Sequence, residues 1–114
     1  MSALTDTLKS MGCGIDEAMA RFLNNEAFYE KCFKKFLDDT VFEGLGAALS
    51  TSSVEDGFSM AHNLKGVSAN LGITPMYEIV AALTEELRAG NMPADAMDRY
   101  NEIMKMRDDL KRLV

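Results

Sequence analysis

His62, Lys65 and Gly66 are the residues of this sequence whose types and spacing best suit chemistry. His62 is the only histidine of the chain, and residues three and four positions apart lie on one face of a helix. An imidazole offers a nucleophilic nitrogen near neutral pH, a lysine brings a mobile positive charge, and a glycine leaves the backbone bare. If a helix holds His62 at the surface, this trio predicts an imidazole that accepts a phosphoryl group from an incoming protein.

The pattern around His62 predicts a helix that buries one of its sides. One broad arc of apolar residues must face a core: it contains Val54, Met60, Leu64, Val67 and Leu71, with Phe58 and Ala61 at its edge. His62 lies well off the centre of this arc. The other residues on its side of the helix are small: Ser59, Gly66 and Ala69. A glycine inside a helix costs about 1 kcal/mol relative to alanine, so Gly66 indicates a need for open space beside the ring.

The hydrophobic periodicity of the whole chain predicts five helices. They span about residues 16–23, 26–49, 53–71, 75–89 and 93–113. The loops between the last four are short, so neighbouring helices should run antiparallel. The predicted fold is therefore all-α, an antiparallel up-down four-helix bundle with a short additional N-terminal helix that caps one end. Residues 1–13 give an ambiguous pattern, which is compatible with a loosely attached extension.

Two breaks between the predicted helices carry capping signals. Ser52 and Glu55 have the capping-box spacing, in which each side chain satisfies a free backbone N–H near the other. Thr74 and Pro75 combine a hydroxyl for the N-cap with a proline for the first helical position. These signals predict that the His62 helix starts just after Ser52 and that the next helix starts at Pro75.

Length and charge narrow the class of protein. The 114 residues suit one domain, since domains typically hold about 100–150 residues. The net charge of −6 argues against nucleic acid and anionic membranes, because both attract positive charge. The first residues lack the charged start and apolar run of a signal peptide, and no apolar stretch approaches the roughly 20 residues of a membrane span. The expected location is therefore the cytoplasm.

The potential metal ligands do not form a recognisable site. Cys13 and Cys32 match no zinc-binding spacing. One histidine with scattered acidic residues gives poor ligand geometry for a transition metal. The two cysteines are expected to be reduced thiols, with a disulfide between them as the alternative. No metal is therefore expected on this chain.

The residues around His62 resemble the signature of histidine-containing phosphotransfer (HPt) domains. The matching stretch is AHNLKGVSANLG, residues 61–72. In the family pattern, lysine follows the histidine at the third position and glycine at the fourth, and small residues lead to a leucine-glycine end. Residues 22–37 are similar to the family's entry into its long second helix, and residues 74–90 to the helix beside the phosphorylated one.

This resemblance implies a four-helix phosphorelay intermediate. His62 would accept a phosphoryl group from the aspartate of a receiver domain and pass it to another receiver. Lys65 would assist electrostatically, and Gly66 would secure access. The chain would bind no cofactor and have no kinase activity of its own, because the receiver brings the magnesium ion and most of the catalytic groups.

The resemblance also assigns a docking surface and an orienting contact. The docking residues would be Ser59, Asn63, Ala69 and Asn70. Many family members hold the second imidazole nitrogen with a glutamine or glutamate on the next helix. Thr84 falls nearest that place in this sequence and Glu85 is next to it, so the chain departs from the family pattern here. From the residues alone, Glu86 is a third candidate for this acceptor.

The partners implied are response-regulator receiver domains, and a hybrid sensor kinase is a further candidate. The chain would be either free-standing or one domain of a larger kinase. A different reading is a non-catalytic docking module, in which the bundle binds receivers or other signalling proteins through the His62 face and no phosphate moves. The complete set of His62, Lys65 and Gly66 favours transfer, because docking alone does not need it.

Overall fold

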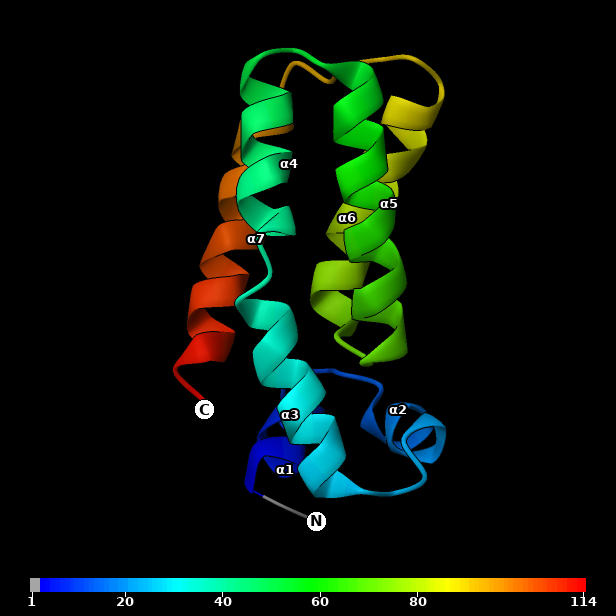
Figure 1. Ribbon diagram of the computed structural model, residues 1–114, viewed down its shortest axis with the longest axis vertical. Helices are drawn as coiled ribbons and strands as arrows, with labels where there is room; N and C mark the ends of the chain where they lie inside the picture. The colour runs from blue at the N-terminus through cyan, green and yellow to red at the C-terminus, as the bar shows by residue number, and fades with distance from the viewer. Residues whose placement is uncertain (1–2) are drawn as a thin grey trace.

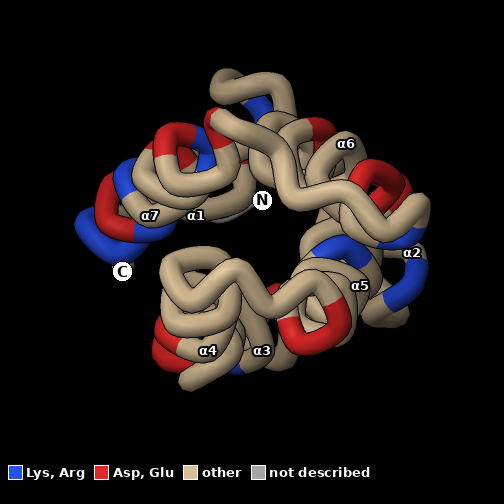
Figure 2. Tube along the Cα trace, turned by 90° about the horizontal axis from the view of Figure 1, so that it is seen from above, with Lys and Arg blue, Asp and Glu red and all other residues tan. Residues whose placement is uncertain are grey.

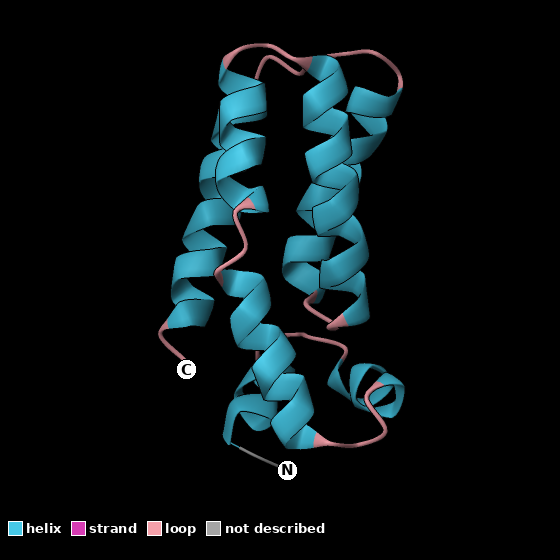
Figure 3. Cartoon of the chain, in the orientation of Figure 1, coloured by secondary structure: helices cyan, strands magenta, loops and turns pink. Residues whose placement is uncertain are grey.

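The computed structural model describes residues 3–114, and within this range every regular element is a helix (Figures 1 and 3). In chain order the helices are α1 (Ala3–Ser10), α2 (Ile15–Arg21), α3 (Glu26–Leu37), α4 (Val41–Ser50), α5 (Val54–Asn70), α6 (Thr74–Arg88) and α7 (Ala96–Lys111). The predicted all-α class is confirmed.

Helices α4 to α7 form the predicted four-helix bundle. Helix α5 packs against α4 and α6, and α7 packs against the same two helices, so the four close a ring around a common core (Figure 2). Successive helices run up and down the long axis (Figure 1). The molecule measures 42 × 23 × 21 Å, and α3 extends α4 beyond the end of the bundle.

The prediction of one long helix over residues 26–49 is wrong. The chain leaves the helical path after Leu37 and starts again at Val41. The backbone N–H of Val41 donates to Asp39 Oδ1 at 2.8 Å, so a side chain takes the place of a helical carbonyl acceptor. Aspartate competes in this way with the helix backbone and favours breaks and caps. Buried apolar residues continue across the break, which is why the periodicity did not reveal it: Phe33, Phe36 and Leu37 come before it, and Val41, Phe42 and Leu45 after it.

The N-terminal segment is part of the packed structure. Helix α1 buries Leu4 and Leu8, and Cys13 joins the same core. The interpretation of residues 1–13 as a loosely attached extension is therefore wrong for residues 3–13, while residues 1–2 lie outside the described part of the chain. The predicted short helix exists as α2 and lies with α1 beyond the end of the bundle (Figure 1).

Both predicted capping arrangements need correction. Ser53, not Ser52, caps α5, since its hydroxyl oxygen accepts from the Asp56 backbone N–H at 3.3 Å. The N-cap of α6 is Ile73, and Thr74 instead accepts from the Gly14 N–H at 3.1 Å. The hydroxyl that could cap α6 is used to fasten the start of α2.

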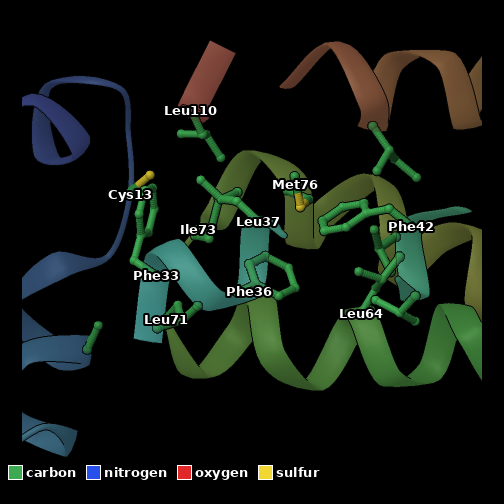
Figure 4. Close-up of a cluster of buried hydrophobic side chains, with 14 of the residues drawn as sticks. Cys13, Phe33, Phe36, Leu37, Phe42, Leu64, Leu71, Ile73, Met76 and Leu110 are labelled. Atoms are coloured by element: carbon green, nitrogen blue, oxygen red, sulfur yellow. The ribbon is translucent and has the colours of Figure 1, made fainter. Parts of the chain in front are cut away.

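The core fixes how α5 is turned about its own axis. Figure 4 shows side chains from several elements meeting there: Cys13, Phe33, Phe36, Leu37, Phe42, Leu64, Leu71, Ile73, Met76 and Leu110. On α5, Ala61 and Leu64 are fully buried, and the buried Ser68 hydroxyl donates to the Leu64 carbonyl at 2.7 Å. With these residues pointing inward, the flank that carries His62 must face outward.

Candidate functional site

His62 lies in the third turn of α5 on the outer side of the bundle. The residue before it, Ala61, is buried, whereas His62 and Asn63 are exposed. The predicted exposure of the imidazole is therefore confirmed. The helix around it is continuous from Val54 to Asn70, so the predicted one-turn spacing of His62, Lys65 and Gly66 is realised in space.

Gly66 leaves open space one turn beyond His62. A Cβ atom added at this position would meet no atom within 4 Å apart from the helix's own backbone. The predicted docking residues Ser59, Asn63, Ala69 and Asn70 are also exposed. Because these side chains are small or polar, they project little from the helix, and a partner protein can approach the backbone closely.

Lys65 is tied to the neighbouring helix by an ion pair. Its Nζ atom lies 3.6 Å from Glu85 Oε1, and the other carboxylate oxygen of Glu85 lies 3.3 Å from Arg88 Nε. Surface ion pairs of this kind contribute about 0–1 kcal/mol. The lysine can therefore exchange Glu85 for another anion at little cost.

None of the three orienting candidates forms a hydrogen bond with the imidazole, and Glu86 pairs with Arg99 of α7 instead. Thr84 is fully buried, and its hydroxyl donates to the Val80 carbonyl of its own helix at 2.7 Å. The Glu85 carboxylate faces Lys65 and Arg88. Within residues 3–114, His62 makes a ring contact but no hydrogen bond. The structure thus brings His62, Lys65 and Glu85 to one region and leaves Thr84 inside the bundle.

Phe58 is a neighbour of His62 that the sequence did not assign to the site. The two rings stack at 20° with their centroids 5.6 Å apart. The Cζ atom of Arg88 lies 4.9 Å from the centroid of the Phe58 ring. The spacing of four residues could have indicated the Phe58 contact, but the ring was assigned to the edge of the core arc. Arg88 comes from another helix and gave no local signal.

Arg21 fastens α2 to the end of α5. Its Nη2 atom donates to the carbonyls of Ala69 and Asn70 at 2.9 and 3.0 Å, and its Nε atom donates to Asn70 at 3.1 Å. The last carbonyls of a helix have no intrahelical partner and carry partial negative charge. Arg21 therefore fixes the backbone of two predicted docking residues.

The two cysteines lie apart from the surface around His62 and are not joined to each other. Cys13 and Cys32 are free thiols, so the alternative of a disulfide between them is excluded. Burial raises the pKa of Cys13, and a hydrogen bond with the Thr74 backbone lowers it by less. In the part of the chain that the structure describes, no three potential metal-ligating side chains gather at one place. Nor does any described helix have the length and apolarity to cross a membrane.

Comparison with known proteins agrees with this architecture. The family model for the Hpt domain matches residues 33–114, a stretch that runs from within α3 to the C-terminus and contains His62. No curated protein and no solved structure gives a match. The family match covers well over half of the chain and all four helices of the bundle. The chain therefore belongs to the HPt domain family, whose members act as phosphocarriers in His–Asp signalling.

Proposed function

We propose that this protein is a phosphorelay intermediate that receives a phosphoryl group on His62 from the aspartate of a receiver domain and passes it to another receiver. The observation that carries the proposal is the exposed imidazole with open space beside Gly66. A receiver must bring its aspartyl phosphate in line with a ring nitrogen, and a covered ring would not allow that approach.

The transfer needs only the imidazole as the reacting group on this side. A lone pair on one ring nitrogen attacks the phosphorus atom, the N–P bond forms, and the P–O bond to the aspartate breaks. The electron pair of that bond stays on the aspartate as its carboxylate. The reverse step, with a second receiver's aspartate as the nucleophile, returns His62 to its free form.

Lys65 supplies charge stabilisation in this scheme. Phosphoryl transfer depends mainly on positioning and on neutralising the charge of the equatorial oxygens. The half-buried Lys65 ammonium is paired with Glu85 over 3.6 Å. Because that pairing is weak, the ammonium can turn toward the phosphoryl oxygens once they arrive. Lys65→Ala should slow transfer without abolishing it.

The partner carries the remaining machinery. We assign the magnesium ion and most catalytic groups to the receiver domain, and no cofactor to this chain. Receiver domains are the proposed partners on both sides of the relay, and a hybrid sensor kinase is the proposed source of the first phosphoryl group. Such a relay operates in the cytoplasm.

The test is incubation with a phosphorylated receiver from the same genome. The wild-type chain should take up one acid-labile phosphate, and His62→Gln should take up none while keeping its helical content. A His62→Gln protein that still takes up the label would contradict the proposal. If the wild type binds the receiver but no phosphate moves, the bundle is a docking module instead.

A further inference from the structure

We propose that Phe58 and Arg88 are positioning residues for His62: the Phe58 ring orients the imidazole by stacking on it, and Arg88 holds the Phe58 ring in place. This inference rests on the proposed phosphotransfer function of His62. It assigns the task of orienting the ring to an aromatic contact, where the resemblance to the family predicted a hydrogen bond from the next helix.

The stack fits the direction in which helical side chains point. The centroid distance of 5.6 Å lies within the range of about 4.5–7 Å that aromatic pairs prefer. Side chains on a helix lean toward its N-terminus and cover the preceding turn. His62 therefore leans toward Phe58, four residues earlier, and away from Gly66. The imidazole therefore has the Phe58 ring on its N-terminal side and open space on the side of Gly66.

Helix α6 contacts the Phe58 ring through Arg88. The Arg88 guanidinium carbon is 4.9 Å from the Phe58 centroid, within the reach of about 6 Å for a cation–π contact. The same guanidinium lies 3.3 Å from Glu85, and Glu85 also lies 3.6 Å from Lys65. One carboxylate thus pairs both with Lys65 and with the arginine that contacts Phe58, so α6 supports the site through these two cations.

The contact matters because no hydrogen bond or ion pair within the described residues orients the ring. Thr84, Glu85 and Glu86, the three candidate acceptors, have other partners. A ring nitrogen must point at the incoming phosphorus, and loss of alignment slows a reaction even when binding is unchanged. From the usual strength of aromatic pairs, we expect removal of the Phe58 ring to slow transfer about three- to tenfold.

The first test compares single-turnover transfer from a phosphorylated receiver at increasing receiver concentration. Phe58→Leu should lower the maximal rate about three- to tenfold and leave the half-saturating concentration unchanged. Phe58→Tyr keeps the ring and should restore the rate. Arg88→Gln should give a smaller loss, and Arg88→Lys should recover part of it. Phe28→Leu is the matched control, since Phe28 is 51% exposed and packs on Phe22 instead.

The second test detects the stacking of His62 on Phe58 by NMR in the protein alone, with no receiver present. His62 is the only histidine, so its ring protons are the only imidazole signals in an NMR spectrum. Stacking on Phe58 should shift them upfield, and Phe58→Leu should abolish this shift while Phe28→Leu leaves it in place. Unchanged ring signals in Phe58→Leu, or a wild-type transfer rate in that variant, would overturn the inference. A higher half-saturating concentration with an unchanged maximal rate would also overturn it, because Phe58 would then be a docking contact.

The two tests separate this inference from the proposed function. If the wild type accepts no phosphate from any receiver, the proposed function fails whatever the ring protons show. If the wild type is labelled on His62 but Phe58→Leu behaves like it in both tests, only the positioning role fails.

Discussion

The middle of α5 and its C-terminal end each carry a glycine of the same motif, and the two glycines have opposite surroundings. At Gly66, an added Cβ atom would meet nothing within 4 Å. At Gly72, it would come within 2.5 Å of the Gly14 carbonyl oxygen, and the backbone φ is +73°. The Gly72 carbonyl also accepts the Gly14 N–H at 2.9 Å. One glycine keeps space open outside the fold, and the other lets two backbone segments meet inside it.

A short motif therefore mixes residues that serve function with residues that serve folding. Gly66 costs the helix about 1 kcal/mol and gains no contact. Gly72 ends the helix in a conformation that other residues adopt only with strain. A sequence pattern gives both glycines equal weight, whereas the surrounding atoms tell them apart.

Gly72→Ala should have the largest effect on stability. The new Cβ atom meets backbone, which cannot move aside cheaply, and the positive φ adds its own penalty. Together these should lower the free energy of unfolding by about 3 kcal/mol in a urea titration. Gly90→Ala is the control, because Gly90 has a φ of +86° but open surroundings. Its free energy of unfolding should fall by only about 1 kcal/mol. Equal losses in the two variants would show that the close contact with Gly14 does not contribute to the effect.

Gly66→Gln should separate function from stability. A long side chain at this position projects into the open space beside His62, so a receiver can no longer reach the ring. Transfer from a phosphorylated receiver should slow at least about tenfold, equivalent to about 1.4 kcal/mol in the barrier. The urea midpoint should stay the same or rise slightly. Transfer at the wild-type rate would show that the space is not the path of approach.

Gly66→Ala is a smaller change that also tests whether Gly66 serves access to His62 and not the stability of the fold. Alanine favours the helix by about 0.5–1 kcal/mol over glycine, and its methyl group meets nothing here. The variant should therefore unfold at a higher urea concentration than the wild type and still transfer phosphate at a similar rate. A loss of stability would mean that the helix is packed more tightly at Gly66 than the geometry indicates.

The smallest expected effect concerns the buried thiol near the Gly14–Gly72 contact. Burial raises the pKa of Cys13, so the folded protein favours the neutral thiol. This contribution is fully present below the ordinary thiol pKa of about 8.5 and is lost as the pH rises through the higher folded-state pKa. Unfolding titrations at increasing alkaline pH should show a steeper loss of stability for the wild type than for Cys13→Ala. If stability fell equally with pH in the wild type and in Cys13→Ala, the raised pKa of Cys13 would be contradicted.

Much of this molecule could be predicted from local patterns. The apolar arc of α5 has a period that only a helix satisfies, and it correctly left His62 outside the core. The break at residues 38–40 was missed because buried apolar residues continue across it and only the Asp39 side chain reveals the turn. Ser53 in place of Ser52 as the cap is a shift of one residue, which spacing rules do not resolve.

The surroundings of the candidate site depended on contacts between helices, which a single sequence does not display. Thr84 was placed correctly on the neighbouring helix, but burial against the core decided where its hydroxyl points. Arg88 reaches Phe58 from α6, and Arg21 reaches the end of α5 from residues far away in the chain. Such partners become visible only when the helices are packed together.

The most direct test of the central claim is to observe the His62 imidazole while the phosphoryl group arrives. A nitrogen-15 NMR spectrum of the chain should contain the ring signals of one histidine only. On addition of a phosphorylated receiver with magnesium, one ring nitrogen should shift and become coupled to phosphorus, and it should return when a second, unphosphorylated receiver is added in excess. Ring nitrogens that stay unchanged while the receiver loses its phosphate to this chain would contradict the account.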